Sequence, residues 1–177
     1  YAVLDWGPTL LGEWKGVSIH HAGWMVAAFE ISGIVGMLVA GWATDRFFGG
    51  RGPRVCVICM ALATVFVALF WGISQPPMWL ATLLLGAAGF CIYGPQALVG
   101  IAAANIATKK AAATAVGFTG LFGYASTLVS GWGLGLLAQH YGWNIAVGAL
   151  ILIAIMGTLI FMAAWSAKAN GYDLSLI

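Results

Sequence analysis

Three polar side chains lie in the middle of long apolar runs, and these residues have the chemistry to bind a solute inside a membrane. They are Glu30, Tyr93 and Tyr124. At about 1.5 Å per helical residue, Glu30 and Tyr124 lie roughly 18 Å, and Tyr93 roughly 16 Å, from the predicted inner ends of their helices. The hydrocarbon core is about 30 Å thick, so all three should lie near its midplane. One carboxylate and two phenols at one depth predict a central polar site.

Each of these residues also has a purely structural interpretation. A carboxylate at a helix centre costs about 2.5–3.5 kcal/mol even on a lenient insertion scale, so Glu30 should face the interior or water and have a partner. We interpret it as a substrate, proton or gating group, with a buried structural pair as the alternative. Taken singly, each tyrosine is equally well explained by packing, with its hydroxyl donating to a neighbouring carbonyl.

Helix-breaking residues surround the two tyrosines. Pro95 follows Tyr93 closely and has no N–H, which leaves the carbonyl of Cys91 without its usual helical partner. In lipid such a freed group needs a new partner. A small-residue face consists of Ala113, Gly117 and Gly120 and leads to Tyr124 at helical spacing. This face suits either close helix packing or a substrate path, whereas Gly131-x-x-x-Gly135 is expected only to permit close helix approach.

The composition sets the class of protein. Of the 177 residues, 62% are hydrophobic and only 7% are charged, and the mean hydropathy is +0.98. Soluble domains average about 25% charged residues, so this chain is an integral membrane protein. A net charge of +2 is too small to indicate a nucleic-acid partner. Cys56-Val-Ile-Cys59 and Cys91 lie in apolar runs without a second cysteine pair or a histidine cluster, so we expect no metal or other cofactor.

The chain should be entirely α-helical. A membrane-spanning helix needs about 20 apolar residues, and the sequence offers five such stretches after the end of a truncated helix at about 1–11. The predicted spans are 22–43, 55–73, 78–104, 111–138 and 143–167. We expect polar or basic links at 13–21 and 44–54 and a turn at 139–142. Because the first residue is Tyr1, we also expect the chain to be a piece of a longer protein.

The cationic residues predict the orientation. Six of them fall on one side of the predicted membrane, namely Arg46, Arg51, Arg54, Lys109, Lys110 and Lys168, and only Lys15 falls on the other. By the positive-inside rule the basic side is cytoplasmic, and so is the C-terminus. Tryptophans cluster near the opposite, outer ends, as an interfacial aromatic belt should: Trp6, Trp14, Trp24, Trp71, Trp79 and Trp143.

The basic link contains a recognisable pattern. Asp45-Arg46, followed by glycines and Arg51, resembles the loop signature of the major facilitator superfamily, G-x-x-x-D-R-x-G-R-R, loosened by an insertion. In that family the loop is a charge-linked latch between helices. The resemblance therefore implies that Asp45, Arg46 and Arg51 are gating residues, while topology alone is the alternative.

Five motifs occur together in order. They are Tyr1-x-x-x-Asp5-Trp6-x-Pro8-Thr9, Phe29-Glu30-x-x-Gly33, Gly41-Trp42-x-x-Asp45-Arg46, Tyr93-Gly94-Pro95 and Gly117-Phe118-Thr119-Gly120-Leu121-Phe122-Gly123-Tyr124. With them the chain resembles the C-terminal half of an organophosphate:phosphate antiporter of the major facilitator superfamily. The resemblance implies six helices, seven to twelve, of a fold with two six-helix halves around one site. The missing N-terminal half would then be a partner, together with the lipid bilayer.

The same resemblance suggests ligands. In the family, arginines of both halves hold the phosphate, and tyrosines of two of these motifs line the pocket, which implies that role for Tyr93 and Tyr124. The family's arginine in helix seven would precede Tyr1, so this sequence lacks it. Our substrate-binding candidates are Tyr93, Tyr124, Glu30 and Gln96.

The expected function is exchange of an organic phosphate for inorganic phosphate across the bacterial inner membrane, by alternating access around a midplane site. A dianion cannot cross lipid and needs a cationic, hydrogen-bonding pocket that opens to one side at a time. The main alternative is a membrane sensor of the same family that binds sugar phosphate and signals to a histidine kinase. A scaffold bundle is disfavoured by the shared depth of the three polar groups. An enzyme is disfavoured because no nucleophile–base set is evident.

Overall fold

The computed structural model describes residues 2–107 and 110–166, apart from the side chains at positions 4, 14 and 106. This part of the chain is helical and contains no strand, so the predicted all-α class is confirmed. The helices are α1 (Ala2–Lys15), α2 (Ile19–Phe48), α3 (Gly52–Gly72), α4 (Met78–Ile106), α5 (Ala112–Tyr141) and α6 (Trp143–Ala163). α4 is continuous through Pro95.

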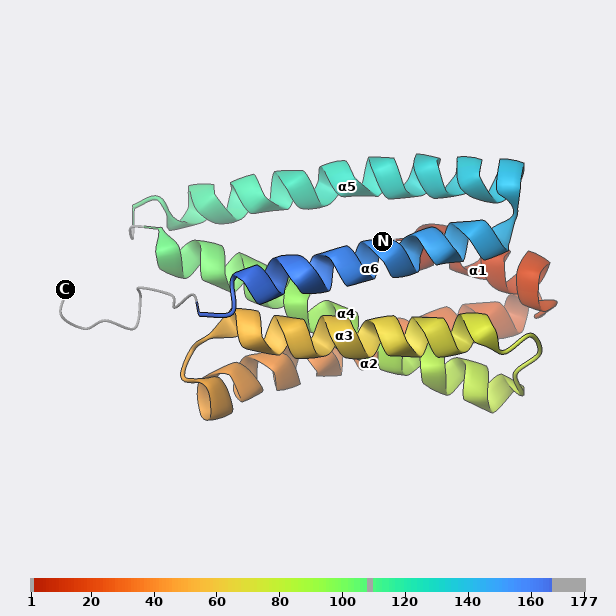
Figure 1. Ribbon diagram of the computed structural model, residues 1–177, viewed down its shortest axis with the longest axis horizontal. Helices are drawn as coiled ribbons and strands as arrows, with labels where there is room; N and C mark the ends of the chain where they lie inside the picture. Colours follow the sequence, from red (N-terminus) through yellow and green to blue (C-terminus); the bar gives the residue numbers. More distant parts are fainter. Residues whose placement is uncertain (1, 108–109, 167–177) are drawn as a thin grey trace.

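Five of these helices, α2 to α6, are long and apolar enough to cross a membrane. The chain is therefore a multi-pass membrane protein. Successive helices run in opposite directions along the bundle (Figure 1). The α1–α2, α3–α4 and α5–α6 connections lie at one end, and the α2–α3 and α4–α5 connections lie at the other. Lys15 donates to the carbonyl of Ile73 at the first end, and Arg54 donates to that of Trp165 at the second, over 3.4 Å.

The link expected at 44–54 is much shorter than predicted. α2 continues to Phe48, so Asp45 and Arg46 lie on its last helical turn and not in a loop. The helix ends at Gly49, which adopts the left-handed conformation (φ 55°, ψ 46°) and donates its N–H to the carbonyl of Thr44. A glycine here closes the helix without steric cost, and a cation in the last turn suits the helix dipole.

Other predicted boundaries also differ from the observed helices. The 13–21 segment was expected to be loop-like, but α1 continues to Lys15 and α2 begins at Ile19. The turn expected at 139–142 reduces to Gly142, with φ 83°, and α6 ends at Ala163. The physical reason is that low hydropathy marks where a helix leaves the hydrocarbon. Its backbone hydrogen bonds continue into the interface until a glycine or an unfavourable residue ends them.

The tightest contact in the bundle joins α2 to α4, which share the most extensive interface among the described helices. A Cβ added at Gly36 would lie 2.0 Å from the carbonyl oxygen of Phe90, and one at Gly89 would lie 2.4 Å from that of Phe29. The hydroxyl of Ser32 donates to the carbonyl of Gly86 across the same interface, at 2.7 Å. Backbone therefore packs directly on backbone, as small residues allow in membrane helix pairs.

The core is built mainly from α1 to α4. Its largest cluster contains Leu11, Ala22, Met25, Phe29, Phe70, Ala81, Leu84, Leu85 and Ala88. α5 differs from these helices because Leu134 is its one buried residue. In Figure 1, α5 runs along one edge of the bundle, beside α6. Most of its apolar surface therefore faces away from the core.

Candidate solute-binding site

The structure brings two of the three mid-depth residues into direct contact. The hydroxyl of Tyr93 on α4 donates a hydrogen bond to Oε2 of Glu30 on α2. Residues 63 positions apart in sequence are thereby joined at one level of the bundle. Glu30 and Tyr93 are both half-buried, so the pair lies at the boundary between the packed α2–α4 interface and the open surface.

The Phe29-Glu30-x-x-Gly33 motif forms the seat for the Tyr93 side chain. A Cβ added at Gly33 would lie 2.6 Å from Cδ2 of Tyr93, so only a glycine leaves room for the ring in this position. Phe29, one helical turn before Gly33, meets the same ring edge-on, with centroids 6.1 Å apart and planes at 73°. The motif thus supplies a packing partner, an open position and a hydrogen-bond acceptor for one phenol.

The second oxygen of Glu30 has a different environment. Oε1 is buried and has no hydrogen-bond partner among the residues that the structure describes. A buried acceptor left unsatisfied costs about 1–3 kcal/mol, and more when it is charged. This oxygen can therefore take up a proton, a cation or a donor group from a solute. Oε1 is thus a buried acceptor of the described site that is available for a hydrogen bond or an ionic contact.

Tyr124 lies on α5 and is 70% exposed. The glycines that precede it are open as well, since a Cβ added at Gly117, Gly120 or Gly123 meets nothing within 4 Å. The small-residue face is therefore not a packing surface for another helix in the described chain. Gly135 contrasts with it, because a Cβ there would lie 2.6 Å from Cζ2 of Trp6. The prediction of close packing at Gly131-x-x-x-Gly135 is confirmed.

The remaining predicted site residues are on the surface. Gln96 is exposed on α4, one turn beyond Tyr93. Asp45 and Arg46 are exposed at the end of α2, and Arg51 precedes α3 as its N-cap. Their roles in binding and gating stay predictions. Lys109 and Lys168, which entered the orientation argument, lie outside the described residues.

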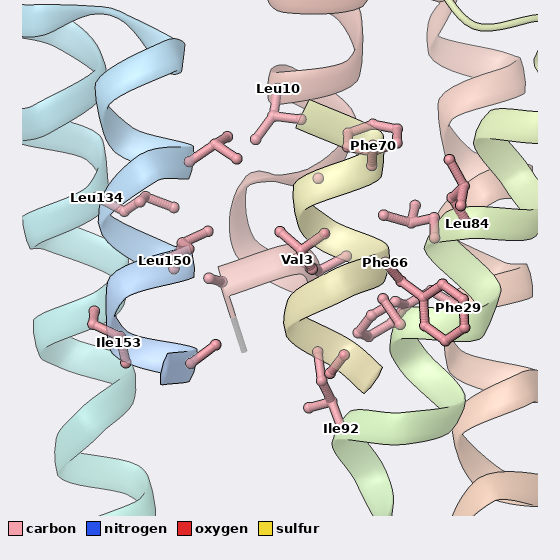
Figure 2. A pocket seen from close by; sticks show the side chains of 18 of the residues that line it. Val3, Leu10, Phe29, Phe66, Phe70, Leu84, Ile92, Leu134, Leu150 and Ile153 are labelled. Carbon is pink, nitrogen blue, oxygen red and sulfur yellow. The ribbon is translucent and has the colours of Figure 1, made fainter. Parts of the chain in front are cut away.

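A separate cavity of about 240 Å³ lies inside the bundle and does not belong to this site. Figure 2 shows its lining, which includes Val3 from α1, Phe66 from α3, Ile92 from α4 and Leu150 from α6. Every lining residue that the structure describes is apolar. A phosphate would lose its hydration there without gaining a donor, so this cavity cannot be an anion site. The described residues also contain no group of three metal-ligating side chains placed to hold a metal ion.

Two residues with a part in the site were not singled out for it by their sequence pattern. Gly33 was noted only as part of a motif, although it makes space for the Tyr93 ring. Gly94 serves α4 in the same way, since a Cβ there would lie 2.9 Å from that of Ala40 on α2. The available signal was a glycine close behind a mid-depth polar residue on the same helix, three positions after Glu30 and one after Tyr93.

Comparisons with known proteins agree with this architecture. The sequence profile described as Major Facilitator Superfamily matches residues 6–171. A "Probable hexose phosphate transport protein" of Chlamydia pneumoniae is 38% identical over 167 residues, which are 94% of this chain and 37% of that relative. A "Glycerol-3-phosphate transporter" of Bacillus subtilis is 35% identical over 167 residues, which are 94% of this chain and 38% of that relative.

A third relative is the "Membrane sensor protein UhpC" of Escherichia coli, 34% identical over 155 residues, which are 87% of this chain and 34% of that relative. The chain thus spans less than two fifths of the length of these relatives. The predicted resemblance to organophosphate:phosphate antiporters is confirmed, and so is the expectation that this chain is not an enzyme. This chain belongs to the Major Facilitator Superfamily.

Proposed function

We propose that the intact protein carries an organic phosphate ester across the bacterial inner membrane in exchange for inorganic phosphate. The observation that carries the proposal is the Glu30–Tyr93 pair, a carboxyl group and a phenol joined by a hydrogen bond between two membrane helices. Kinship with a hexose phosphate and a glycerol-3-phosphate transport protein supports a phosphorylated substrate. Alternating access around one central site is the mechanism that such membrane folds use.

The cationic part of the site comes from arginines that this sequence does not contain. None of the seven Lys and Arg residues of this chain lies in the middle of a predicted span, so the residues of this chain contribute neutral donors to the phosphate. Tyr93, Tyr124 and Gln96 are those donors. Arginines, which bind phosphate through two parallel hydrogen bonds, suit the complementary role.

Tyr93 cannot serve Glu30 and a phosphate at the same time, because a phenol has one proton to donate. In the empty site its hydroxyl stays on Glu30 Oε2. When phosphate binds, the hydroxyl turns to the phosphate, and Glu30 pairs with a pocket cation or a proton. The carboxylate of Glu30 thus takes the place of the phosphate as hydrogen-bond acceptor. It keeps the Tyr93 hydroxyl oriented when no phosphate is bound.

The orientation proposed for the chain places the basic ends of the helices in the cytoplasm. Arg46, Arg51 and Arg54 lie at the end of the bundle opposite Lys15. α6 ends at Ala163, at the same basic end of the bundle, and the C-terminus is cytoplasmic in this proposal. Asp45, Arg46 and Arg51 then form a latch that closes this side of the site.

A sensor is the second candidate function, favoured by the kinship with a membrane sensor protein. Both candidates bind a phosphorylated solute at the same site, and they differ only in whether the solute crosses. The intact protein, reconstituted into liposomes loaded with inorganic phosphate, separates them. Labelled glycerol-3-phosphate and glucose-6-phosphate should enter only when phosphate is inside. Saturable binding without entry would support the sensor instead, and the absence of binding would contradict both.

A further inference from the structure

A second cavity lies near the end of the bundle with the α5–α6 turn, where α1, α5 and α6 meet. Its volume is about 470 Å³, and its lining includes Trp6, Thr9 and Glu13 of α1, Trp132 and Gln139 of α5, and Trp143 of α6. Three indoles from three helices therefore surround one carboxylate. The α1 residues lie three and four positions apart, which places them on one face of that helix.

Contacts within the protein fix two of these indoles. Trp143 donates its Nε1–H to Oε2 of Glu13 over 2.8 Å, and Trp6 donates its Nε1–H to the carbonyl of Gly131 over 2.8 Å. Their rings meet edge-on, with centroids 6.1 Å apart. Both N–H groups are thus already used, so these rings can offer a ligand only their π surfaces. Trp132, which is 75% exposed, is the third indole in the lining of the cavity.

The electrostatics of this cavity favour a cation. Among the residues that the structure describes, its lining contains Glu13 and no Lys, Arg or His. The ammonium group of the nearby Lys15 donates to the carbonyl of Ile73 and lies over the ring of Phe70. The faces of indole rings attract cations, and tryptophan does so most strongly of the aromatic residues. An anionic substrate would be repelled here.

We propose that this cavity, defined by Trp6, Trp132, Trp143 and Glu13, binds a small organic ammonium ion. The ammonium group would lie against the indole faces and pair with the carboxylate of Glu13. Methylated and primary amines share this chemistry, whether they are free in water or carried by a lipid headgroup. The proposal is independent of the phosphate site, which has other residues and binds the opposite charge.

Ordinary membership of the interfacial aromatic belt does not account for this arrangement. Trp24 on α2 and Trp79 on α4 are each 67% exposed and do not line the cavity, as expected for belt residues that face lipid. The rings of Trp6 and Trp143 instead meet edge-on, and Trp143 donates to Glu13. Trp24 therefore provides a matched control for the cavity tryptophans.

The test is calorimetric titration of the intact protein, in phosphatidylglycerol nanodiscs, with choline and with sodium at equal ionic strength. Wild-type protein should bind choline saturably and should show no saturable binding of sodium. Glu13→Gln keeps an acceptor for Trp143 but removes the charge, and Trp132→Leu removes an exposed indole. Each should weaken choline binding about five- to thirtyfold. Trp24→Leu should leave it unchanged.

Three results would overturn the proposal: no saturable binding of choline by the wild type, equal affinity for sodium, or unchanged affinity in Glu13→Gln and Trp132→Leu. The source of the amine is tested by repeating the titration in nanodiscs that contain phosphatidylethanolamine. Weaker apparent affinity for free choline would assign the site to a lipid headgroup. Unchanged affinity would assign it to a water-borne amine, and both results support a cation site.

Discussion

The hydroxyl of Tyr93 and the carboxylate of Glu30 form one hydrogen bond across the α2–α4 interface, and this bond involves only one of the two carboxylate oxygens. Oε2 accepts a hydrogen bond from the Tyr93 hydroxyl. Oε1 is buried and has no donor among the residues that the structure describes. A permanent structural pair would satisfy both oxygens. The incomplete pair is instead what a site needs if a cation or solute is to complete it.

The seat of the Tyr93 ring predicts the effect of a single added methyl group. Gly33→Ala places a Cβ 2.6 Å from the ring, so the ring must shift. We expect a loss of about 1–3 kcal/mol in the free energy of unfolding, as overpacking typically causes. Gly120→Ala is the matched control, since nothing lies within 4 Å of its added Cβ. Equal thermal unfolding of the two variants would contradict the described packing.

Removal of the charge on Glu30 should strengthen phosphate binding. Glu30→Gln leaves an acceptor for Tyr93, but a neutral acceptor holds the hydroxyl about 1 kcal/mol less strongly than a charged one. The hydroxyl is then released more easily, and the apparent affinity for phosphate should rise about fivefold. Equilibrium binding to the intact protein measures this change. A lower affinity would mean that Glu30 contacts the substrate directly.

The proposed orientation predicts accessibility from opposite sides. In the intact protein, a cysteine in place of the exposed Lys110 should react with membrane-impermeant thiol reagents only from the cytoplasm. A cysteine in place of Gln75, in the α3–α4 connection, should react only from outside. The native Cys56 and Cys91 are buried and Cys59 is half-buried, so the protein without added cysteines is labelled in parallel to measure the background. Labelling of both new cysteines from one side would refute the topology.

The pairing of Glu30 with Tyr93 could be anticipated in part, since counting residues along two helices gives depth. Lateral position was less predictable. α5 is similarly apolar around its whole circumference, so its sequence does not say which face meets a neighbour. The absence of a packing neighbour within 4 Å of an added Cβ at Gly117 or Gly120 therefore became clear only from the structure. Trp6 and Trp143 were assigned to the interfacial belt because depth alone places them there, whereas their convergence on Glu13 depends on how three helices pack.

The helix ends show a similar limit. Hydropathy falls at Asp45 because a charge does not belong in lipid, but the α2 backbone stays helical until Gly49 ends it. The glycine signal was present in the sequence and marks this boundary better than the charges do. Charged residues at the interface remain hydrated and need not leave the helix. Asp45 and Arg46, for which a latch role is proposed, therefore lie on the last helical turn of α2.

The structure also predicts that removing the hydroxyl of Tyr93 and removing that of Tyr124 will affect the stability of the protein differently. Tyr93→Phe takes away the donor to Glu30 Oε2 and should lower the melting temperature of the ligand-free protein. Tyr124 is 70% exposed, so Tyr124→Phe should lower that temperature less than Tyr93→Phe does. Tyr93→Phe should weaken phosphate binding by the smaller factor, since its hydroxyl gives up Glu30 when the phosphate binds.

The most direct test of the proposed site is equilibrium binding of organophosphate to Tyr124→Phe in the intact protein, alongside its ligand-free melting. A hydrogen bond to a charged acceptor contributes about 1.5–3 kcal/mol, so the apparent affinity should fall roughly ten- to a hundredfold, with a smaller decrease in melting temperature than in Tyr93→Phe. Wild-type affinity in Tyr124→Phe, together with wild-type affinity in Tyr93→Phe, would remove both hydroxyls from the site and contradict the account.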